Sequence, residues 1–263
     1  FMEPECAVGL PEGEDGVLVH TSSQSIYDEQ HEICTMLNLP PEKVRCHSML
    51  VGGGFGGKED MSVQHHAALA AWVMKAPVKV KLTRQESLEV HPKRHPMDIE
   101  ITTSCDDEGH LTGVKAIIMA NTGAYASLGG PVLQRACTHA SGPYNFQNFE
   151  VIGKAIYTNM VPAGAFRGFG VTQSCFAVES NINLLADELG MDYYEIRRIN
   201  ALKPGDIMPN GQIASEDTGV IECLEAVKDA YYSSPRAGIA VAFKNTGLGV
   251  GFPDTGRCIL SVE

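Results

Sequence analysis

Two glycine-rich segments, at residues 52–57 and 164–170, constrain the fold of this chain more than any other feature. Each lies between an apolar stretch with the pattern of a strand and a stretch with the pattern of a helix, so each predicts a tight connection from strand to helix. The flanking stretches are 44–51 and 61–74 around the first segment, and 149–157 and a long helix that stops at Gly190 around the second. A unit of strand, glycine loop and helix that occurs twice predicts two lobes, each mixing helices with strands.

The rest of the chain continues this alternation. Stretches 98–103 and 111–120 flank a turn and predict a β-hairpin, because Gly109 can take the positive φ that the turn needs. Further strands are expected at 17–20, 78–82 and 239–243. Further helices are expected from Ser22 or Ser23 to Leu37, at 191–202 and at 219–232. The long helix that stops at Gly190 should carry four apolar residues on one face: Phe176, Ile182, Leu185 and Leu189. We therefore expect an α+β chain (mixed α/β) of mixed sheets and packed helices, with a first lobe at 1–95 and a second at 96–263.

The composition narrows the class of protein. Hydrophobic residues make up 44% and charged residues 20%, as in ordinary globular chains, and the net charge of -12 argues against nucleic-acid and anionic-membrane partners. No apolar run reaches the roughly 18 residues of a spanning helix, and the first residues do not read as a signal peptide. The eight cysteines are scattered singly, without a CxxC pair. We therefore expect reduced thiols, no metal held by protein side chains, and a cytoplasmic location.

The first glycine segment, Gly52-Gly53-Gly54-Phe55-Gly56-Gly57-Lys58-Glu59, matches several motifs. As a dinucleotide fingerprint it has the right glycines, but the acidic residue expected about 20 positions later at the end of the next strand is missing. As a P-loop it has Lys58, but Glu59 stands where Ser or Thr should hold magnesium. A tight turn that packs a helix on a sheet is the third interpretation.

The second segment, Ala165-Phe166-Arg167-Gly168-Phe169-Gly170, also precedes a helix. Its glycines let the backbone approach a ligand, and Arg167 adds a permanent charge that suits phosphate or oxo groups. Two phenylalanines in a glycine loop find little to pack against. They favour a pocket for a flat ligand over a place in the core.

Both segments, taken together with other motifs in order, carry a family resemblance. Over essentially its whole length, the chain resembles the xanthine dehydrogenase and aldehyde oxidase family. The motifs that carry this resemblance are Met2-Glu3-Pro4-Glu5, GGGFGGKE at 52–59, Arg94-His95-Pro96, Gln134-Arg135-Ala136, FRGFG at 166–170 and Gln173. The resemblance implies a molybdenum held by a pterin (molybdopterin), beside Gly54, Phe55, Gly56, Arg167 and Gly168, with Gln173 near the cofactor. Phe169, with Phe166 on the same loop, would stack against a flat heteroaromatic substrate.

Glu59 and Arg135 bear on the substrate that the resemblance implies. In the purine-oxidising branch, a glutamate at the position of Glu59 hydrogen-bonds a ring nitrogen, and an arginine at that of Arg135 stabilises negative charge on a ring carbonyl. A nicotinate-like acid, whose carboxylate would meet Arg135, is the second candidate, and a Rossmann-type nucleotide-binding module is the third. Taken singly, Glu59 could instead be a helix-dipole partner and Arg135 a surface ion pair.

The resemblance also implies parts that the chain does not contain. We read both ends of the chain as cuts, so the catalytic glutamate should lie in the rest of the molybdopterin subunit, and iron–sulfur and flavin (FAD) modules should remove the electrons. We expect this chain alone to hold only part of the cofactor site, to lack molybdenum and to be inactive. The family's second stacking phenylalanine aligns with Val250, unless Phe252 replaces it.

Two smaller predictions concern a pair of histidines and the junction after residue 232. His65 and His66 are adjacent on a helix and face different directions, so we expect surface residues rather than metal ligands. The helix at 219–232 runs almost directly into the apolar stretch 239–243. A helix that reverses into a buried strand needs a longer connection, so we expect a missing segment between Ser234 and Pro235.

Overall fold

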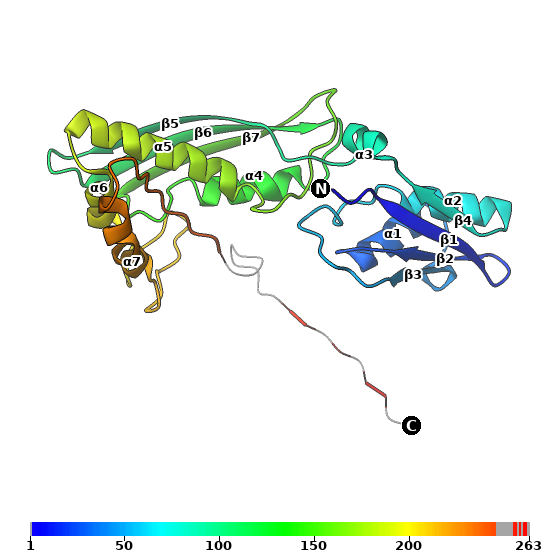
Figure 1. Cartoon of the computed structure of the whole chain (residues 1–263). Coiled ribbons are helices and arrows are strands. Elements are labelled where there is room, and N and C mark those ends of the chain that lie inside the picture. The colour runs from blue at the N-terminus through cyan, green and yellow to red at the C-terminus, as the bar shows by residue number, and fades with distance from the viewer. Residues whose placement is uncertain (1, 246–254, 257, 259, 262–263) are drawn as a thin grey trace. The chain divides into compact units, whose positions relative to one another are not determined.

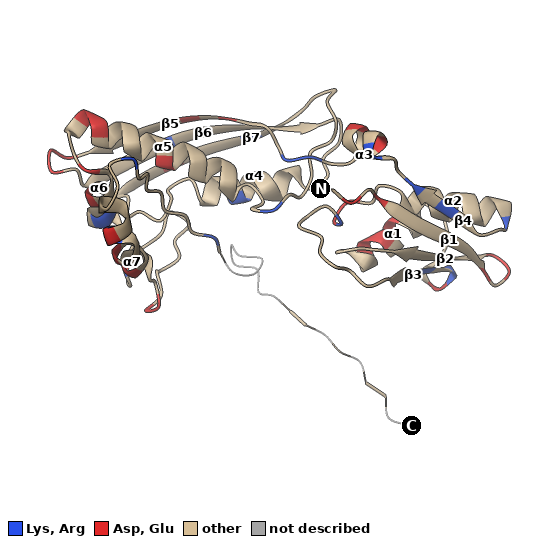
Figure 2. Ribbon diagram, viewed as in Figure 1, with Lys and Arg blue, Asp and Glu red and all other residues tan. Residues whose placement is uncertain are grey.

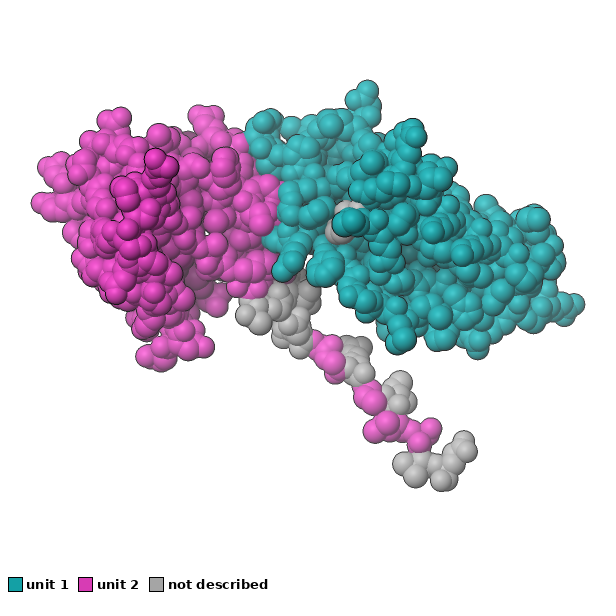
Figure 3. All heavy atoms as spheres, in the orientation of Figure 1, with its two compact units in different colours: residues 1–98, 119–133, 154–169 teal, residues 99–118, 134–153, 170–263 magenta. Residues whose placement is uncertain are grey.

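The structure, a computed structural model, describes residues 2–245, 255–256, 258 and 260–261 (Figure 1). The chain forms two compact units: unit 1 contains residues 1–98, 119–133 and 154–169, and unit 2 contains 99–118, 134–153 and 170–263 (Figure 3). Residues 1–95, the first lobe expected from the sequence, all lie in unit 1, whereas 96–263 are shared by both units.

Unit 1 is built on a four-stranded sheet with the strand order β3-β2-β1-β4. The strand β1 (Cys6–Glu12) pairs antiparallel with β2 (Gly16–Thr21) and with β4 (Val78–Lys81), and β3 (Val44–Ser48) pairs parallel with β2. The core is shared by the sheet and the helices α1 (Ile26–Leu37) and α2 (Gln64–Met74); its buried members include Ala7, Val17, Val19, Ile33, Ala67 and Ala71. A short 3-10 helix, η1 (Pro41–Lys43), leads into β3.

The ends of the helices in unit 1 follow from local chemistry. Helix α1 begins at Ile26 and not at Ser22 or Ser23, because the backbone of Gln24 is bound elsewhere, donating to the carbonyl oxygen of Lys58 at 2.8 Å. It ends where Asn38 adopts the left-handed conformation, a common way to close a helix. Helix α3 (Arg84–Val90) begins with a capping box in which Thr83 and Glu86 satisfy each other's backbone N–H groups.

The predicted hairpin is confirmed as β5 (Met97–Cys105) and β6 (Leu111–Gly123), and β7 (Asn148–Tyr157) completes a three-stranded sheet in the order β5-β6-β7. The hairpin turn carries an acidic run at 106–108 (Figure 2). In unit 2, α5 (Val171–Leu189) packs on this hairpin and on α6 (Tyr193–Asn200), with Leu111, Val114, Val178, Ile182, Ala186 and Ile196 in the core. The remaining helices are α4 (Gly129–Thr138) and α7 (Val220–Tyr232).

Two sequence predictions in unit 2 are wrong. Phe176 is 77% exposed, because it lies about 200° around the helix from Val178, which is in the core. Residues 239–243 form no strand and are at most half-buried. One premise for a missing segment, a buried strand at 239–243, is therefore not met. Instead a turn closes the join, with the Ala237 N–H donating to the carbonyl of Ser234 at 3.1 Å.

The α+β class is confirmed, with mixed sheets and packed helices. Among the described residues, no helix combines the length and the apolar character needed to cross a membrane.

Candidate functional site

The first glycine loop is a series of tight turns in unit 1. The Gly57 N–H donates to the Gly54 carbonyl at 2.8 Å, and the backbone takes positive φ at Phe55 (55°) and Gly56 (90°). The helix α2 begins only at Gln64, and β3 before the loop lies at the edge of the sheet. The Rossmann and P-loop interpretations both need a helix N-terminus directly at the loop, so the geometry does not support them.

Gln24 organises this loop. Its Oε1 accepts from the N–H groups of Gly56 at 3.0 Å and Lys58 at 3.3 Å, and its Nε2 donates to Glu59 Oε1 at 3.0 Å. A Cβ atom at Gly54 would overlap the side chain of Gln24, so this position requires glycine. Gln24 belongs to none of the sequence motifs. The only signal was a long amide among the serines of 22–25, directly before a helix.

The two glycine loops are in contact within unit 1. A Cβ atom at Gly56 would lie 2.7 Å from the carbonyl carbon of Ala165 and 2.9 Å from the backbone nitrogen of Phe166. The guanidinium of Arg167 lies 5.6 Å from the ring centroid of Phe55. Segments more than 100 residues apart in sequence therefore meet backbone to backbone.

Arg94 supports the second loop. Its Nη2 donates to the carbonyl of Arg167 at 2.7 Å, and its guanidinium lies 4.2 Å from the ring centroid of Phe166. The loop itself turns at Gly168 (φ 96°) and Phe169 (φ 51°), where the Phe169 N–H donates to the Phe166 carbonyl at 2.8 Å. Phe166 and Phe169 are half-buried, and Arg167 is exposed.

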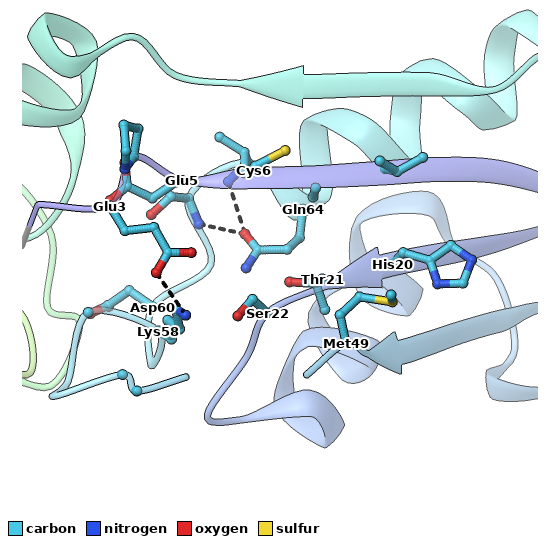
Figure 4. Close-up of a pocket in the computed structure, with 18 of the residues that line it drawn as sticks. Glu3, Glu5, Cys6, His20, Thr21, Ser22, Met49, Lys58, Asp60 and Gln64 are labelled. Atoms are coloured by element: carbon cyan, nitrogen blue, oxygen red, sulfur yellow. Dashed lines mark hydrogen bonds and ion pairs between the residues drawn. The ribbon is translucent and has the colours of Figure 1, made fainter. Parts of the chain in front are cut away.

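A cavity of about 660 Å³ opens beside the first glycine loop, lined by that loop, by residues 2–8 and by the end of β2 (Figure 4). Lys58 forms an ion pair of 3.2 Å with Glu3 at its wall. Three polar atoms of the lining are buried without a hydrogen-bond partner: Glu5 Oε2, Thr21 Oγ1 and Asp60 Oδ2. Buried polar atoms normally find partners, so these three indicate a cavity that suits a polar ligand.

Glu59 lines a second cavity of unit 1, of about 970 Å³, together with Asp28, Asp60, Tyr125 and Leu128. Burial raises the pKa of the Glu59 carboxyl, and the neighbouring carboxylates of Asp60 and Asp28 raise it further. Asp60 itself accepts a hydrogen bond from the hydroxyl of Ser127. Glu59 therefore holds a proton more readily than an ordinary glutamate and can act as a hydrogen-bond donor.

Arg135 and Gln173 lie in unit 2. Arg135 is half-buried in the last turn of α4, and its Nη1 donates to Asn245 Oδ1 at 3.1 Å. Gln173 lies in the first turn of α5, where its Oε1 accepts from Thr172 Oγ1 at 2.8 Å. The other predicted site residues, from Gly54 to Glu59 and from Phe166 to Phe169, lie together in unit 1. Val250 and Phe252 lie outside the described residues.

No group of three or more potential ligands lies close enough to hold a metal ion within the part of the chain that is described. His65 and His66 contact each other, with ring centroids 3.9 Å apart, and burial followed by the charge of His66 lowers the pKa of His65 to about 4. His66 is exposed, whereas His65 is half-buried.

The chain matches the molybdopterin cofactor-binding domain family over residues 1–201. It is 37% identical to one subunit of a probable xanthine dehydrogenase of Bacillus subtilis, over the whole chain and 37% of that protein. It is 42% identical to the nicotinate dehydrogenase large molybdopterin subunit of Eubacterium barkeri, over 87% of the chain and 54% of that protein. The chain thus spans about half or less of the length of these two relatives.

Solved structures share the fold. The aldehyde oxidoreductase of Desulfovibrio gigas matches 88% of the chain and 25% of its own, with a TM-score of 0.84 and 27% identity. Quinoline 2-oxidoreductase of Pseudomonas putida matches 88% of the chain and 30% of its own, with a TM-score of 0.80 at 24% identity. The chain therefore belongs to the molybdopterin cofactor-binding domains of the molybdenum hydroxylase family, which confirms the resemblance carried by its two glycine loops.

Proposed function

We propose that this chain supplies the two glycine loops and the substrate-facing residues of a hydroxylase that oxidises a small nitrogen heteroaromatic at a molybdenum–pterin centre. The observation that carries the proposal is the contact of the two loops in unit 1, with Gly56 against Ala165 and Arg167 over Phe55. When bound, the molybdenum–pterin group supplies the oxidation and the oxygen derived from water.

The residues present fit such a group. Gly54, Phe55, Gly56 and Gly168 offer backbone groups in tight turns, Arg167 offers a guanidinium for oxo or phosphate oxygens, and Gln173 adds an amide. The orphaned atoms of the 660 Å³ cavity, two carboxylate oxygens and a hydroxyl, support a ligand that carries N–H groups, as a pterin does.

Glu59 and Arg135 are the residues that we assign to the substrate. Gln24 fixes one carboxyl oxygen of Glu59, so the carboxyl group is oriented before the substrate arrives. In its protonated form, which the raised pKa favours, Glu59 would donate a hydrogen bond to a ring nitrogen. Arg135 would stabilise negative charge on the substrate, and Phe169, with Phe166, would stack against its ring.

Two substrate classes fit this assignment. A purine-like ring would place a carbonyl oxygen at Arg135, in keeping with the Bacillus relative, which is named as part of a xanthine dehydrogenase. A nicotinate-like acid would place a carboxylate there, in keeping with the Eubacterium relative, which is named as part of a nicotinate dehydrogenase. We propose that in either case the complete enzyme is cytoplasmic and includes the rest of the molybdopterin subunit together with iron–sulfur and flavin modules.

The test is made on the complete protein in its purified, assembled form. We expect molybdenum in near-stoichiometric amount, and oxygen-18 from labelled water in the hydroxylated product of hypoxanthine or nicotinate. Glu59→Ala should lower kcat/KM by about 10²–10⁴-fold, the range for a positioned acid–base group, while the molybdenum content stays unchanged. A protein that lacks molybdenum and binds NAD or ATP tightly would contradict the proposal and favour a nucleotide-binding module.

A further inference from the structure

Two histidines face each other across neighbouring strands of unit 1. His20 in β2 and His47 in β3 are register partners in the parallel pair of strands, so their side chains lie on the same face of the sheet. Val17 and Val19 of β2 are fully buried, and since side chains alternate along a strand, His20 lies on the face opposite this core. The fold thus brings together two imidazole rings from positions 27 residues apart, with ring centroids separated by 5.1 Å.

The distance between the two rings suits a metal ion. The Nδ1 atoms of His20 and His47 lie 3.2 Å apart, and only one proton can lie between them, so in the hydrogen-bonded pair one ring donates and the other accepts. Zinc binds imidazole nitrogen at about 2.0–2.1 Å, so two nitrogens at this separation correspond to an N–Zn–N angle of about 100–105°. That angle is close to the tetrahedral one that zinc prefers, of about 109°. The two nitrogens therefore match two adjacent corners of a zinc site without a change in their separation.

The pair is accessible to an ion from solvent. The side chain of His47 is exposed, and β3, which carries it, is the edge strand of the sheet. His20 is half-buried and lines the 660 Å³ cavity, near Met49 (Figure 4). A metal site needs an entry path, and here one ligand faces solvent and the other faces a cavity.

The charges on this face of the sheet do not oppose a bound cation. Arg45 lies on the same face as His47, two residues before it, and its guanidinium forms an ion pair of 3.0 Å with Glu12. The two lysines of β4 start two strand spacings from β2, about 10 Å away, where water and salt screen their charge. On its other side His20 has the apolar Val8 as its register partner.

We propose that His20 and His47 form a two-histidine site for a divalent transition-metal ion, with zinc as the occupant that the N–Zn–N angle favours. Imidazole nitrogens suit zinc, copper and nickel, whereas calcium and magnesium take oxygen ligands. Water completes the coordination. A bound ion links the edge strand β3 to β2 four residues before the first glycine loop begins at Gly52. The site does not depend on the proposed function, because both ligands and their separation are set by the sheet of unit 1.

The test is a zinc titration of the complete protein after dialysis against a chelator. By calorimetry we expect one zinc ion per chain, and X-ray absorption at the zinc edge should show two imidazole nitrogens at about 2.0–2.1 Å. His47→Asn keeps an amide that can donate to His20 Nδ1, so the contact between the strands can persist, but an amide is a poor ligand for zinc. The variant should bind zinc at least about ten-fold more weakly, because the second ligand no longer contributes its effective concentration.

The controls separate loss of the site from misfolding. Without zinc, His47→Asn should melt at the same temperature as the unaltered protein, and added zinc should raise only the latter. His20→Asn is the reciprocal variant, with the same expected loss. His31→Gln removes an exposed histidine of α1 and should leave the zinc affinity unchanged.

Three results would overturn the proposal: no zinc binding at about 1 mM, an affinity that neither asparagine variant alters, or an absorption spectrum with fewer than two imidazole ligands. Zinc bound through both histidines in a protein that lacks molybdenum would support this site and overturn the hydroxylase function. Hydroxylation by a protein that binds no zinc would have the opposite meaning.

Discussion

At the scale of single residues, the side chain of Gln24 organises the first glycine loop, because it accepts from the N–H groups of Gly56 and Lys58 and donates to Glu59. Gly54, Glu59 and Arg167 belong to motifs whose spacing along the chain indicates a ligand. Gln24 belongs to no motif, and only the fold brings its amide to the glycine loop, 32 residues away, where it contacts Gly56 and Glu59. Hydrogen bonds of this kind between distant segments leave no periodic pattern in a sequence, so they could not be predicted.

Gln24→Ala should therefore damage the site more than the fold. It removes the acceptor for two backbone N–H groups and the partner of Glu59; because these hydrogen bonds are exposed to water, the loss should cost only about 0.5–1.5 kcal/mol of unfolding free energy. In the complete protein we expect the molybdenum content to fall as well, measured by metal analysis. Gln30→Ala is the control, since Gln30 caps the backbone carbonyls of Pro41 and Val44 away from the loop. Equal molybdenum contents in the two variants would show that Gln24 has only a structural role.

Glu59 should impose a pH limit on turnover. Its pKa is raised by burial and by Asp60 and Asp28, so the protonated form persists to a higher pH than in an ordinary glutamate. If that form donates to the substrate, kcat/KM falls as the pH rises through the raised pKa. Glu59→Gln carries a neutral donor at every pH, so this decrease should vanish from its pH–rate profile. A profile that keeps the same decrease in the variant would assign the titration to another group.

At the scale of elements, strands and helices with clean periodicity were predicted, and those with conflicting signals were not. The hairpin of β5 and β6 agrees with its pattern, and so does the helix α5 apart from the exposed Phe176. Strand β1 contains Gly9 and Pro11, which normally mark the end of a strand. Pro11 is tolerated because β1 pairs with β4 only over residues 6–9, so at Pro11 it has a neighbour on one side only. Helix α4 begins with two glycines and a proline, which are poor helix formers, so its sequence did not predict a helix.

The contact between the two glycine loops should be sensitive to a single methyl group. Gly56→Ala meets both a positive φ of 90° and backbone atoms of Ala165 and Phe166, and we expect a loss of about 2–5 kcal/mol. Gly13→Ala meets a positive φ of 59° but no atom within 4 Å, so it should cost only about 1–2 kcal/mol. Urea denaturation of the two variants measures the difference. Equal losses would mean that the loops do not pack as described.

The junction of α5, α6 and residues 241–245 depends on a buried ion pair. The Arg197 side chain is fully buried and forms an ion pair with Glu179. The other carboxylate oxygen of Glu179, Oε1, accepts a hydrogen bond from the Tyr144 hydroxyl at 2.5 Å. Glu179→Gln leaves the buried charge of Arg197 uncompensated and should destabilise the fold by about 3–5 kcal/mol. Glu195→Gln breaks the exposed pair with Arg198 and should cost at most about 1 kcal/mol. Chemical denaturation distinguishes the two, and similar losses would contradict the burial of the first pair.

At the scale of the whole molecule, this chain covers 37% of the Bacillus relative and 54% of the Eubacterium relative. We expect the 263 residues expressed alone to contain no molybdenum and to be inactive, because part of a cofactor site seldom retains a large cofactor. Metal analysis of the purified chain beside the complete protein makes the comparison. Stoichiometric molybdenum in the chain alone would contradict this expectation.

The division of the chain between its two units restricts how such proteins can be recombined. The polypeptide passes from one unit to the other after residues 98, 118, 133, 153 and 169. Neither unit is one continuous stretch of sequence, so no single cut or fusion point transfers one of them intact to another protein. The last passage falls inside the FRGFG motif, between Phe169 and Gly170. A chimera that exchanges the substrate-facing residues of two relatives must therefore exchange the whole interleaved region, and variation in specificity should arise through point substitutions rather than through shuffled modules.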